Sequence, residues 1–147
     1  MDELSRVTRG VQPRATFGQR LGAYLIDIVI VNVAIFVLGS LVRGAGPGIL
    51  LALALGLGYF SLFEGSGSGQ TVGKRLVRIR VVDFESGLPI PYGRAFVRNA
   101  GRWVSGIVVG LGYLWMLWDR DRQTWHDKFA QTTVVPVESF PVESWPG

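Results

Sequence analysis

One segment constrains this chain more than any other: residues 21–42 are apolar except for Asp27, Asn32 and Ser40. At about 1.5 Å per residue, a helix of this length is about 33 Å long, enough to cross the hydrocarbon core of a bilayer. A signal peptide has a shorter apolar region without an internal acid, and it ends at a small-residue cleavage site. The segment therefore predicts a membrane-spanning helix.

Two more apolar segments predict the rest of the membrane domain. Residues 49–63 carry no charge and follow a break at residues 43–48 that contains Gly and Pro, which predicts an antiparallel partner helix. Residues 103–118 contain three glycines and several aromatic residues, and they predict either a third crossing or a re-entrant segment. The expected fold is an all-α integral membrane protein with helices at about 21–42, 46–63 and 103–118.

The connecting segments predict short elements at the membrane surface. Alternating apolar and polar residues at 76–84 indicate a short strand, and a basic helix is expected to begin at Tyr92. Residues 132–137 are a second strand candidate, which pairs with the first only if both lie on one side of the membrane. The chain then divides into a flexible cytoplasmic N-terminus (1–16), a membrane domain (17–136) and a disordered tail (137–147).

The positions of the basic residues predict the orientation. The chain has 15 Lys and Arg against 11 Asp and Glu, and most of the cations lie in residues 1–20 and 64–102. The positive-inside rule places both segments in the cytoplasm, and the excess of Arg over Lys is typical of a GC-rich bacterium, so the inner membrane of a bacterium is expected. The cations at residues 74–102 flank membrane segments, so anionic lipid headgroups are the expected partner, and nucleic acid is not. A third crossing places the tail outside the cell, whereas a re-entrant segment keeps it inside.

The sequence contains few residues that could bind a metal or a cofactor or carry out catalysis. No Cys is present and His126 is the only imidazole, so thiolate and imidazole metal sites are not expected. Adjacent His126 and Asp127 do not make a catalytic dyad, and a surface or helix-packing role is expected for the imidazole. The glycines at residues 67–73 lack the spacing of a phosphate-binding loop, and Arg75 replaces the hydroxyl that would bind Mg²⁺. We expect no cofactor and no enzymatic activity.

Asp27 is the strongest candidate for a functional residue, because a carboxylate inside a membrane helix costs about 2.5–3.5 kcal/mol and normally has a partner. Two hypotheses compete. Asp27 is either a proton or cation site or one wall of a polar ligand pocket, or else it belongs to a structural ion pair or polar clamp that fixes helix packing. Arg20 lies about 10 Å away along the helix axis, so the alternative charge partners are Arg98 and Arg102 of the basic helix. Asn32 is expected to donate a hydrogen bond to another helix.

Small residues spaced four apart predict close helix packing, either within the chain or between chains. The glycines in such pairs are Gly18, Gly22, Gly56, Gly106 and Gly110. Gly18 pairs with Gly22, Gly106 pairs with Gly110, and Gly56 pairs with Ala52. These positions are the candidates for a helix interface.

Four motifs occur in an order that resembles the RDD family of small integral membrane proteins, which is named for one Arg and two Asp. Arg20 precedes Asp27 by seven residues at the start of the first helix. A Gly-Gln-Thr-Val-Gly-Lys-Arg block begins at Gly69, and a basic stretch follows at residues 94–98. The fourth motif runs from Asp121 to Val135 and begins Asp-Arg-Gln-Thr-Trp-His-Asp, with Asp127 at the end of these seven residues.

The resemblance covers about residues 14–136, and it implies that Arg20, Asp27 and Asp127 are the signature residues. Trp125 and Gln131 depart from the aliphatic residue and the Gly that are usual at these places. The resemblance implies a multi-pass membrane fold. It implies little about activity, because the function of the family is broadly unassigned and ligand transport is only a suggestion.

Two functions are compatible with these features. The preferred hypothesis is an accessory or scaffold subunit that associates with a larger membrane complex. The alternative is an oligomeric transporter or ion-coupled carrier that uses Asp27, and it requires self-association because three helices enclose no pathway on their own. We further expect Arg20 and Asp127 to join one polar network with Asp27 or the basic helix, which requires that they lie on the same side of the membrane.

Overall fold

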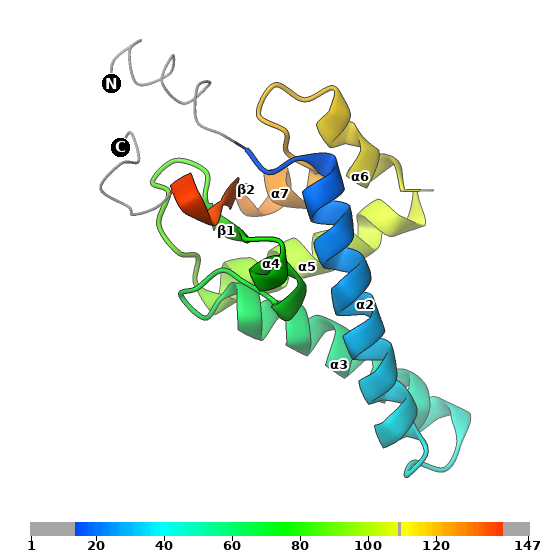
Figure 1. Cartoon of the computed structure of the whole chain (residues 1–147). Coiled ribbons are helices and arrows are strands. Elements are labelled where there is room, and N and C mark those ends of the chain that lie inside the picture. Colours follow the sequence, from blue (N-terminus) through cyan, green and yellow to red (C-terminus); the bar gives the residue numbers. More distant parts are fainter. Residues whose placement is uncertain (1–13, 109, 140–147) are drawn as a thin grey trace.

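Two long helices dominate the computed structural model of the chain, which describes residues 14–108 and 110–139 (Figure 1). Helix α2 (Phe17–Gly39) and helix α3 (Ala45–Glu64) are joined by a short connection, and both are long and apolar enough to cross a membrane. In Figure 1 this connection lies at the end of the molecule opposite to the strands. The two predicted spans are therefore present, and the chain is a membrane protein.

The first helix begins earlier and ends earlier than the predicted 21–42. Thr16 caps it, because its hydroxyl accepts a hydrogen bond from the backbone N–H of Gln19 while the Gln19 side chain accepts one from the backbone N–H of Thr16. Such a reciprocal pair satisfies two backbone donors at a helix start, so the polar residues before position 21 still join the helix. At the other end, Ser40 is the C-cap and its hydroxyl donates to the carbonyl of Val37.

Short elements form the remainder of the described chain. In chain order they are α4 (Val72–Leu76), β1 (Ile79–Asp83), α5 (Tyr92–Ile107), α6 (Leu111–Leu114), the 3₁₀ helix η1 (Trp115–Leu117), α7 (Trp125–Ala130), β2 (Thr132–Pro136) and the 3₁₀ helix η2 (Val137–Ser139). The basic helix begins at Tyr92, as predicted. The strands are shorter than the two candidates: β1 occupies residues 79–83 of the predicted 76–84, because Leu76 ends α4, and β2 occupies residues 132–136 of the predicted 132–137.

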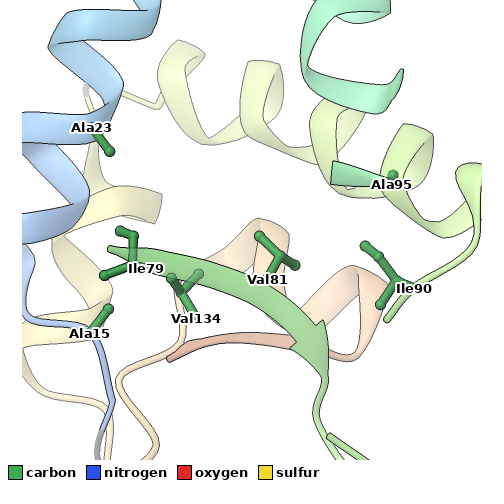
Figure 2. Packing of buried hydrophobic residues seen from close by; sticks show 7 residues of the cluster. All are labelled: Ala15, Ala23, Ile79, Val81, Ile90, Ala95 and Val134. Atoms are coloured by element: carbon green, nitrogen blue, oxygen red, sulfur yellow. The ribbon is translucent and has the colours of Figure 1, made fainter. Parts of the chain in front are cut away.

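Strands β1 and β2 form an antiparallel pair, so the all-α description is incomplete. Ile79 lies opposite Pro136, and Asp83 lies opposite Thr132. Ile79 and Val81 of β1 point from one face of the strand toward Ala23 and Ala95 of the helices (Figure 2). This small apolar core joins the sheet to α2 and α5.

Both proposed terminal boundaries need correction. The backbone N–H of Ala15 donates to the carbonyl of Val134, 2.9 Å away, and Ala15 is buried, so residues 14–16 belong to the folded domain. At the other end, the N–H of Val137 donates to the carbonyl of Arg78 at 2.8 Å, so residues 137–139 do not belong to a disordered tail. The predictions for residues 1–13 and 140–147 lie outside the described residues.

The segment at 103–118 is not one helix. Helix α5 already begins at Tyr92, and the piece formed by α6 and η1 is bent by 112° relative to it. Gly110 has a φ of +73°, a left-handed conformation that favours Gly. A Cβ at Gly112 would lie 2.9 Å from the Cα of Ser105, so this glycine lets the chain fold back against α5. One continuous helix at about 103–118 is therefore not present, and the bend is compatible with both predicted alternatives, a crossing by a broken span or a re-entrant segment.

Candidate functional site

Asp127 lies in the first turn of α7, where the cap of the helix fixes its carboxylate. The Thr124 hydroxyl accepts from the Asp127 N–H, and the Asp127 carboxylate accepts from the Thr124 N–H at 3.0 Å. The same carboxylate binds Arg20 of α2 at 2.5 Å and Arg98 of α5 at 2.8 Å. Burial alone would raise the pKa of Asp127, but Arg20 and Arg98 hold this pKa well below its ordinary value of 3.8.

Glu64, the last residue of α3, accepts from three cations. Arg98 donates to one carboxylate oxygen at 2.6 Å, Arg102 donates to the other at 3.1 Å, and the Lys74 ammonium pairs with that second oxygen too. Glu64 and Arg98 are completely or almost completely buried. Arg98 therefore bridges the two carboxylates, Glu64 on α3 and Asp127 on α7.

These six residues form what we call the charge cluster, which joins five helices. Its members are Arg20, Glu64, Lys74, Arg98, Arg102 and Asp127. Four cations share two carboxylates, which leaves two positive charges in excess. The pKa of Lys74 is lowered to about 8, mainly by burial and also by the nearby Arg102 and Arg98, while the Glu64 carboxylate opposes the shift.

Asp27 belongs to a separate polar site without a cation. Its carboxylate accepts from the Thr71 hydroxyl at 2.5 Å, from the Tyr59 hydroxyl at 2.8 Å and from the Gly73 N–H at 2.8 Å. Among the described residues no ion pair to Asp27 is present, so the predicted partners Arg98 and Arg102 are wrong. These two arginines are used by Glu64 and Asp127.

The approach of α4 to α2 explains how Asp27 is satisfied without a cation. A Cβ at Gly73 would lie 2.1 Å from the carbonyl oxygen of Ala23 and 2.9 Å from the carboxyl carbon of Asp27. Only Gly lets the α4 backbone come close enough to donate to Asp27. Thr71 caps α4 and donates to the same carboxylate. The Gly-Gln-Thr-Val-Gly block therefore supplies two of the hydrogen-bond donors that satisfy Asp27.

The four cations of the charge cluster and Asp27 line one cavity of about 160 Å³. It lies between α2, α3, α5 and the segment that carries Tyr113 and Met116, and Thr124 and His126 complete its wall. His126 is buried, and its Nε2 lies 2.9 Å from the Thr124 hydroxyl, so its role is packing and not a surface role. Burial, together with Arg98, Arg102 and Arg20, holds the pKa of His126 well below 6.5, although Asp127 opposes this shift.

The basic helix has a different environment from the one predicted. Arg98 and Arg102 are buried in the charge cluster, and Arg94 pairs with Asp83 and donates to the carbonyl of Ala130. Arg94 and Arg98 are satisfied inside the protein and are not available to the headgroups of the surrounding bilayer, whereas Arg102 keeps one guanidinium nitrogen without a hydrogen-bond partner among the described residues. The prediction of a lipid contact stays a prediction for exposed Arg75 and Arg78.

The predicted packing glycines contribute little within the described chain. A Cβ at Gly22 or Gly56 would make an ordinary contact with Val77 or Trp103, and one at Gly18 would lie 4.0 Å from Thr16. A Cβ at Gly106 or Gly110 would meet nothing within 4 Å, so close packing inside the chain is wrong there.

The tight approaches lie at other glycines, none of which was among the predicted packing positions. They are Gly65, Gly69, Gly73, Gly101 and Gly112. Asn32 also differs from its prediction, because it donates to the carbonyl of Ile28 in its own helix.

Sequence reasoning missed Glu64 and Lys74. The sequence does contain a signal for this pair: Glu64 is an acidic residue at the end of an apolar helix, and a segment rich in basic residues follows it. Among the described residues no group of three or more His, Cys, Asp and Glu side chains is arranged to hold a metal ion.

The comparisons with known proteins agree with this architecture. The model of the RDD family matches residues 14–131. The proline-rich antigen homolog of Mycobacterium tuberculosis is 36% identical over 69 residues, which are 47% of this chain and 29% of that protein. The proline-rich antigen of Mycobacterium leprae is 33% identical over 70 residues, or 48% of this chain and 28% of that protein. The chain thus matches less than a third of the length of these relatives, and no solved structure matches it.

Proposed function

Because the chain belongs to the RDD family, whose signature residues Arg20 and Asp127 here form a direct ion pair, we propose that it is an accessory or scaffold subunit of a larger membrane complex. The observation that carries this proposal is the charge cluster. Each of its carboxylates is bound by at least two cations inside the protein. Removing one partner of a buried ion pair typically costs about 3–5 kcal/mol, so such a cluster is suited to holding helices in fixed positions.

The surface of the two long helices supports association. On α2, Val29, Val33 and Phe36 are 58–80% exposed, and on α3, Ile49 and Leu50 are more than 60% exposed. In a membrane these faces contact lipid or other apolar helices. The described helices are too few to surround a transport pathway, which favours a role beside other membrane proteins.

The partial match to the relatives supports the view that this membrane domain occurs as one part of longer proteins. Their matched parts cover 28–29% of their lengths, so most of each relative lies outside the similarity. A membrane domain that occurs within longer chains is expected to anchor or position other segments. We assign it no catalytic role.

We also propose that the protein lies in the inner membrane of a bacterium with its N-terminus in the cytoplasm. The pairing of β1 with β2 and the ion pair between Arg20 and Asp127 support one side for residues 14–20, 64–102 and 119–139. The third segment is then a re-entrant element at that side. The excess of basic residues in the first two of these segments supports the cytoplasmic side.

Native purification tests the accessory role. The natively expressed chain, extracted in mild detergent, is sized on a native gel and its companions are identified by mass spectrometry. Stoichiometric recovery of larger membrane proteins is the expected result. Recovery of the chain alone, as a monomer or a small homo-oligomer, contradicts the proposal.

The alternative is a carrier, and one observation favours it. Asp27 has no cationic partner among the described residues and lines the 160 Å³ cavity. A carrier predicts that Asp27→Asn abolishes ion flux in liposomes but leaves assembly intact. The accessory role predicts no flux with the unmodified chain, and it predicts reduced abundance of Asp27→Asn because a buried hydrogen-bond acceptor is weakened.

A further inference from the structure

A second cavity lies beside the charge cluster, between α2, α3 and α5. Its volume is about 360 Å³, which falls within the range of about 300–1,000 Å³ typical of small-molecule sites. It shares Tyr24, Phe60, Arg102 and Tyr113 with the first cavity, so the two meet at the edge of the charge cluster.

The end of the cavity near the charge cluster carries two buried polar atoms without a hydrogen-bond partner among the described residues. They are Nη1 of Arg102 and Oδ1 of Asn99, and both residues are more than nine-tenths buried. The other guanidinium nitrogen of Arg102, Nη2, donates to Glu64, which fixes the side chain. The amide nitrogen of Asn99 donates to Glu64 and to the carbonyl of Ala95, which leaves the oxygen free to accept.

The remainder of the cavity is mostly apolar and elongated. It follows α2 from Tyr24 through Ile28 and Val31 to Ile35, and it reaches Ala52 on α3. Tyr24 and Ile35 are eleven residues apart, which corresponds to about 17 Å along a helix. That is close to half of the hydrocarbon thickness of a bilayer, about 30 Å, and so matches one leaflet.

The charge balance indicates the sign of the ligand. The charge cluster has two positive charges in excess, and Arg102 is the member that reaches this cavity. Its guanidinium carbon lies 4.3 Å from the centre of the Phe60 ring, so the cation is held against an apolar wall. Glu64 binds only Nη2 of this guanidinium, so the buried Nη1 still requires an anion or another strong acceptor.

We propose that this cavity binds one anionic phospholipid. The phosphate accepts from Nη1 of Arg102, a headgroup hydroxyl donates to Oδ1 of Asn99, and an acyl chain lies along α2 toward Ile35. Phosphatidylglycerol has both a phosphate and headgroup hydroxyls, and phosphatidylcholine lacks the hydroxyl donor and carries no net charge. This site is independent of the accessory role, because it needs no protein partner.

The test uses the purified full-length chain in nanodiscs with equal amounts of phosphatidylglycerol and phosphatidylcholine. The lipid that stays bound after transfer to detergent is measured by native mass spectrometry. We expect one phosphatidylglycerol per chain, with phosphatidylcholine retained at least about tenfold less. Equal retention of the two lipids overturns the proposal.

A matched pair of variants separates this site from the lipid that surrounds any membrane protein. Gly106 lines the cavity and Gly93 does not, both lie on α5, and a Cβ at either meets nothing within 4 Å. Gly106→Leu fills the cavity and is expected to reduce bound phosphatidylglycerol about tenfold, whereas Gly93→Leu retains it. Equal retention by both variants overturns the proposal.

Two further measurements identify the interacting groups. Arg102→Lys keeps a cation for Glu64 but loses the second guanidinium nitrogen, so it is expected to weaken phosphatidylglycerol retention while the chain stays folded, as judged by its thermal unfolding. Inorganic phosphate at millimolar concentration is the second probe. If phosphate raises the unfolding temperature as much as phosphatidylglycerol does, the site takes free anions and the lipid assignment is wrong.

Discussion

Glu64 is the residue on which the charge cluster depends most, since Lys74, Arg98 and Arg102 all bind its carboxylate. Asp127 balances Arg20 and shares Arg98, so neither acid can replace the other. The three residues that the resemblance marks as the family signature thus divide between two sites. Arg20 and Asp127 lie in the charge cluster, and Asp27 receives neutral donors from α4 and Tyr59.

Glu64→Gln should strongly destabilise the protein, because it leaves three buried cations with one carboxylate fewer. We expect the free energy of unfolding in detergent to fall by about 3–5 kcal/mol. Glu138→Gln is the matched control, since Glu138 pairs with Arg78 at the surface, where both side chains are more than two-thirds exposed. A surface pair contributes about 0–1 kcal/mol. Equal losses in the two variants would show that Glu64 is not the centre of the cluster.

His126 should make stability depend on pH below about 6.5. Its folded-state pKa is well below 6.5, so the unfolded chain takes up a proton first as the pH falls. The stability contributed by neutral His126 is therefore complete above pH 6.5 and is lost toward acid, by up to about 1.4 kcal/mol per pH unit.

Unfolding of the detergent-solubilised chain at pH 7.5, 6.5 and 5.5 checks this expectation. His126→Gln, which does not titrate, should lose most of the slope between pH 6.5 and 5.5. The same slope in the variant and in the parent chain would assign the pH dependence to another group.

At the scale of elements, the five-residue helix α4 has an effect out of proportion to its length. Its cap Thr71 and its residue Gly73 donate to Asp27, and its residue Lys74 pairs with Glu64. This helix therefore connects the Asp27 site with the charge cluster. A helix this short is not stable alone, since isolated helices shorter than about 12–15 residues are marginal in water. Its contacts with α2 and α3 hold it in place.

Gly73→Ala tests this contact. The added methyl group would lie 2.1 Å from the carbonyl oxygen of Ala23, so α4 must move away from α2 and Asp27 loses a donor. We expect a loss of about 1–3 kcal/mol or more in the free energy of unfolding. Gly39→Ala, in α2, is the control because its Cβ meets nothing within 4 Å. A variant of Gly73 as stable as this control would contradict the contact.

For the whole molecule, the pairing of β1 with β2 restricts the topology. These strands are separated by α5, the bend, α6 and α7, and because they pair, the proposed topology has the chain between them leave and return to one side of the membrane. A straight third crossing would put β2 on the opposite side and remove the ion pair between Arg20 and Asp127.

Cysteine labelling in intact cells tests this topology, and the chain has no Cys of its own. Exposed Arg43, between α2 and α3, and exposed Glu138, after β2, are the two sites. An impermeant maleimide should label Arg43→Cys in intact bacteria and Glu138→Cys only after the membrane is opened. Labelling of Glu138→Cys in intact cells would contradict the proposed topology.

Much of the fold could be predicted because it follows from local patterns. The apolar segments predicted helices α2 and α3, and the alternation of apolar and polar residues at 76–84 predicted strand β1. The bend after α5 was harder to predict, since Gly110 shows its left-handed conformation only in context. The candidate site could be predicted in part: the spacing and order of motifs singled out Arg20, Asp27 and Asp127, but they did not pair them.

The sequence by itself determined that two helices are apolar enough to span a membrane, because the transfer of apolar side chains depends on composition and length. Only the tertiary structure decided how the charges are matched. The cationic partners of Asp127 and Glu64 lie between 10 and 107 residues away in the chain. At such separations local periodicity carries no information. Which buried cation meets which carboxylate depends on how the helices pack, and that packing gave Arg98 and Arg102 to Glu64 instead of Asp27.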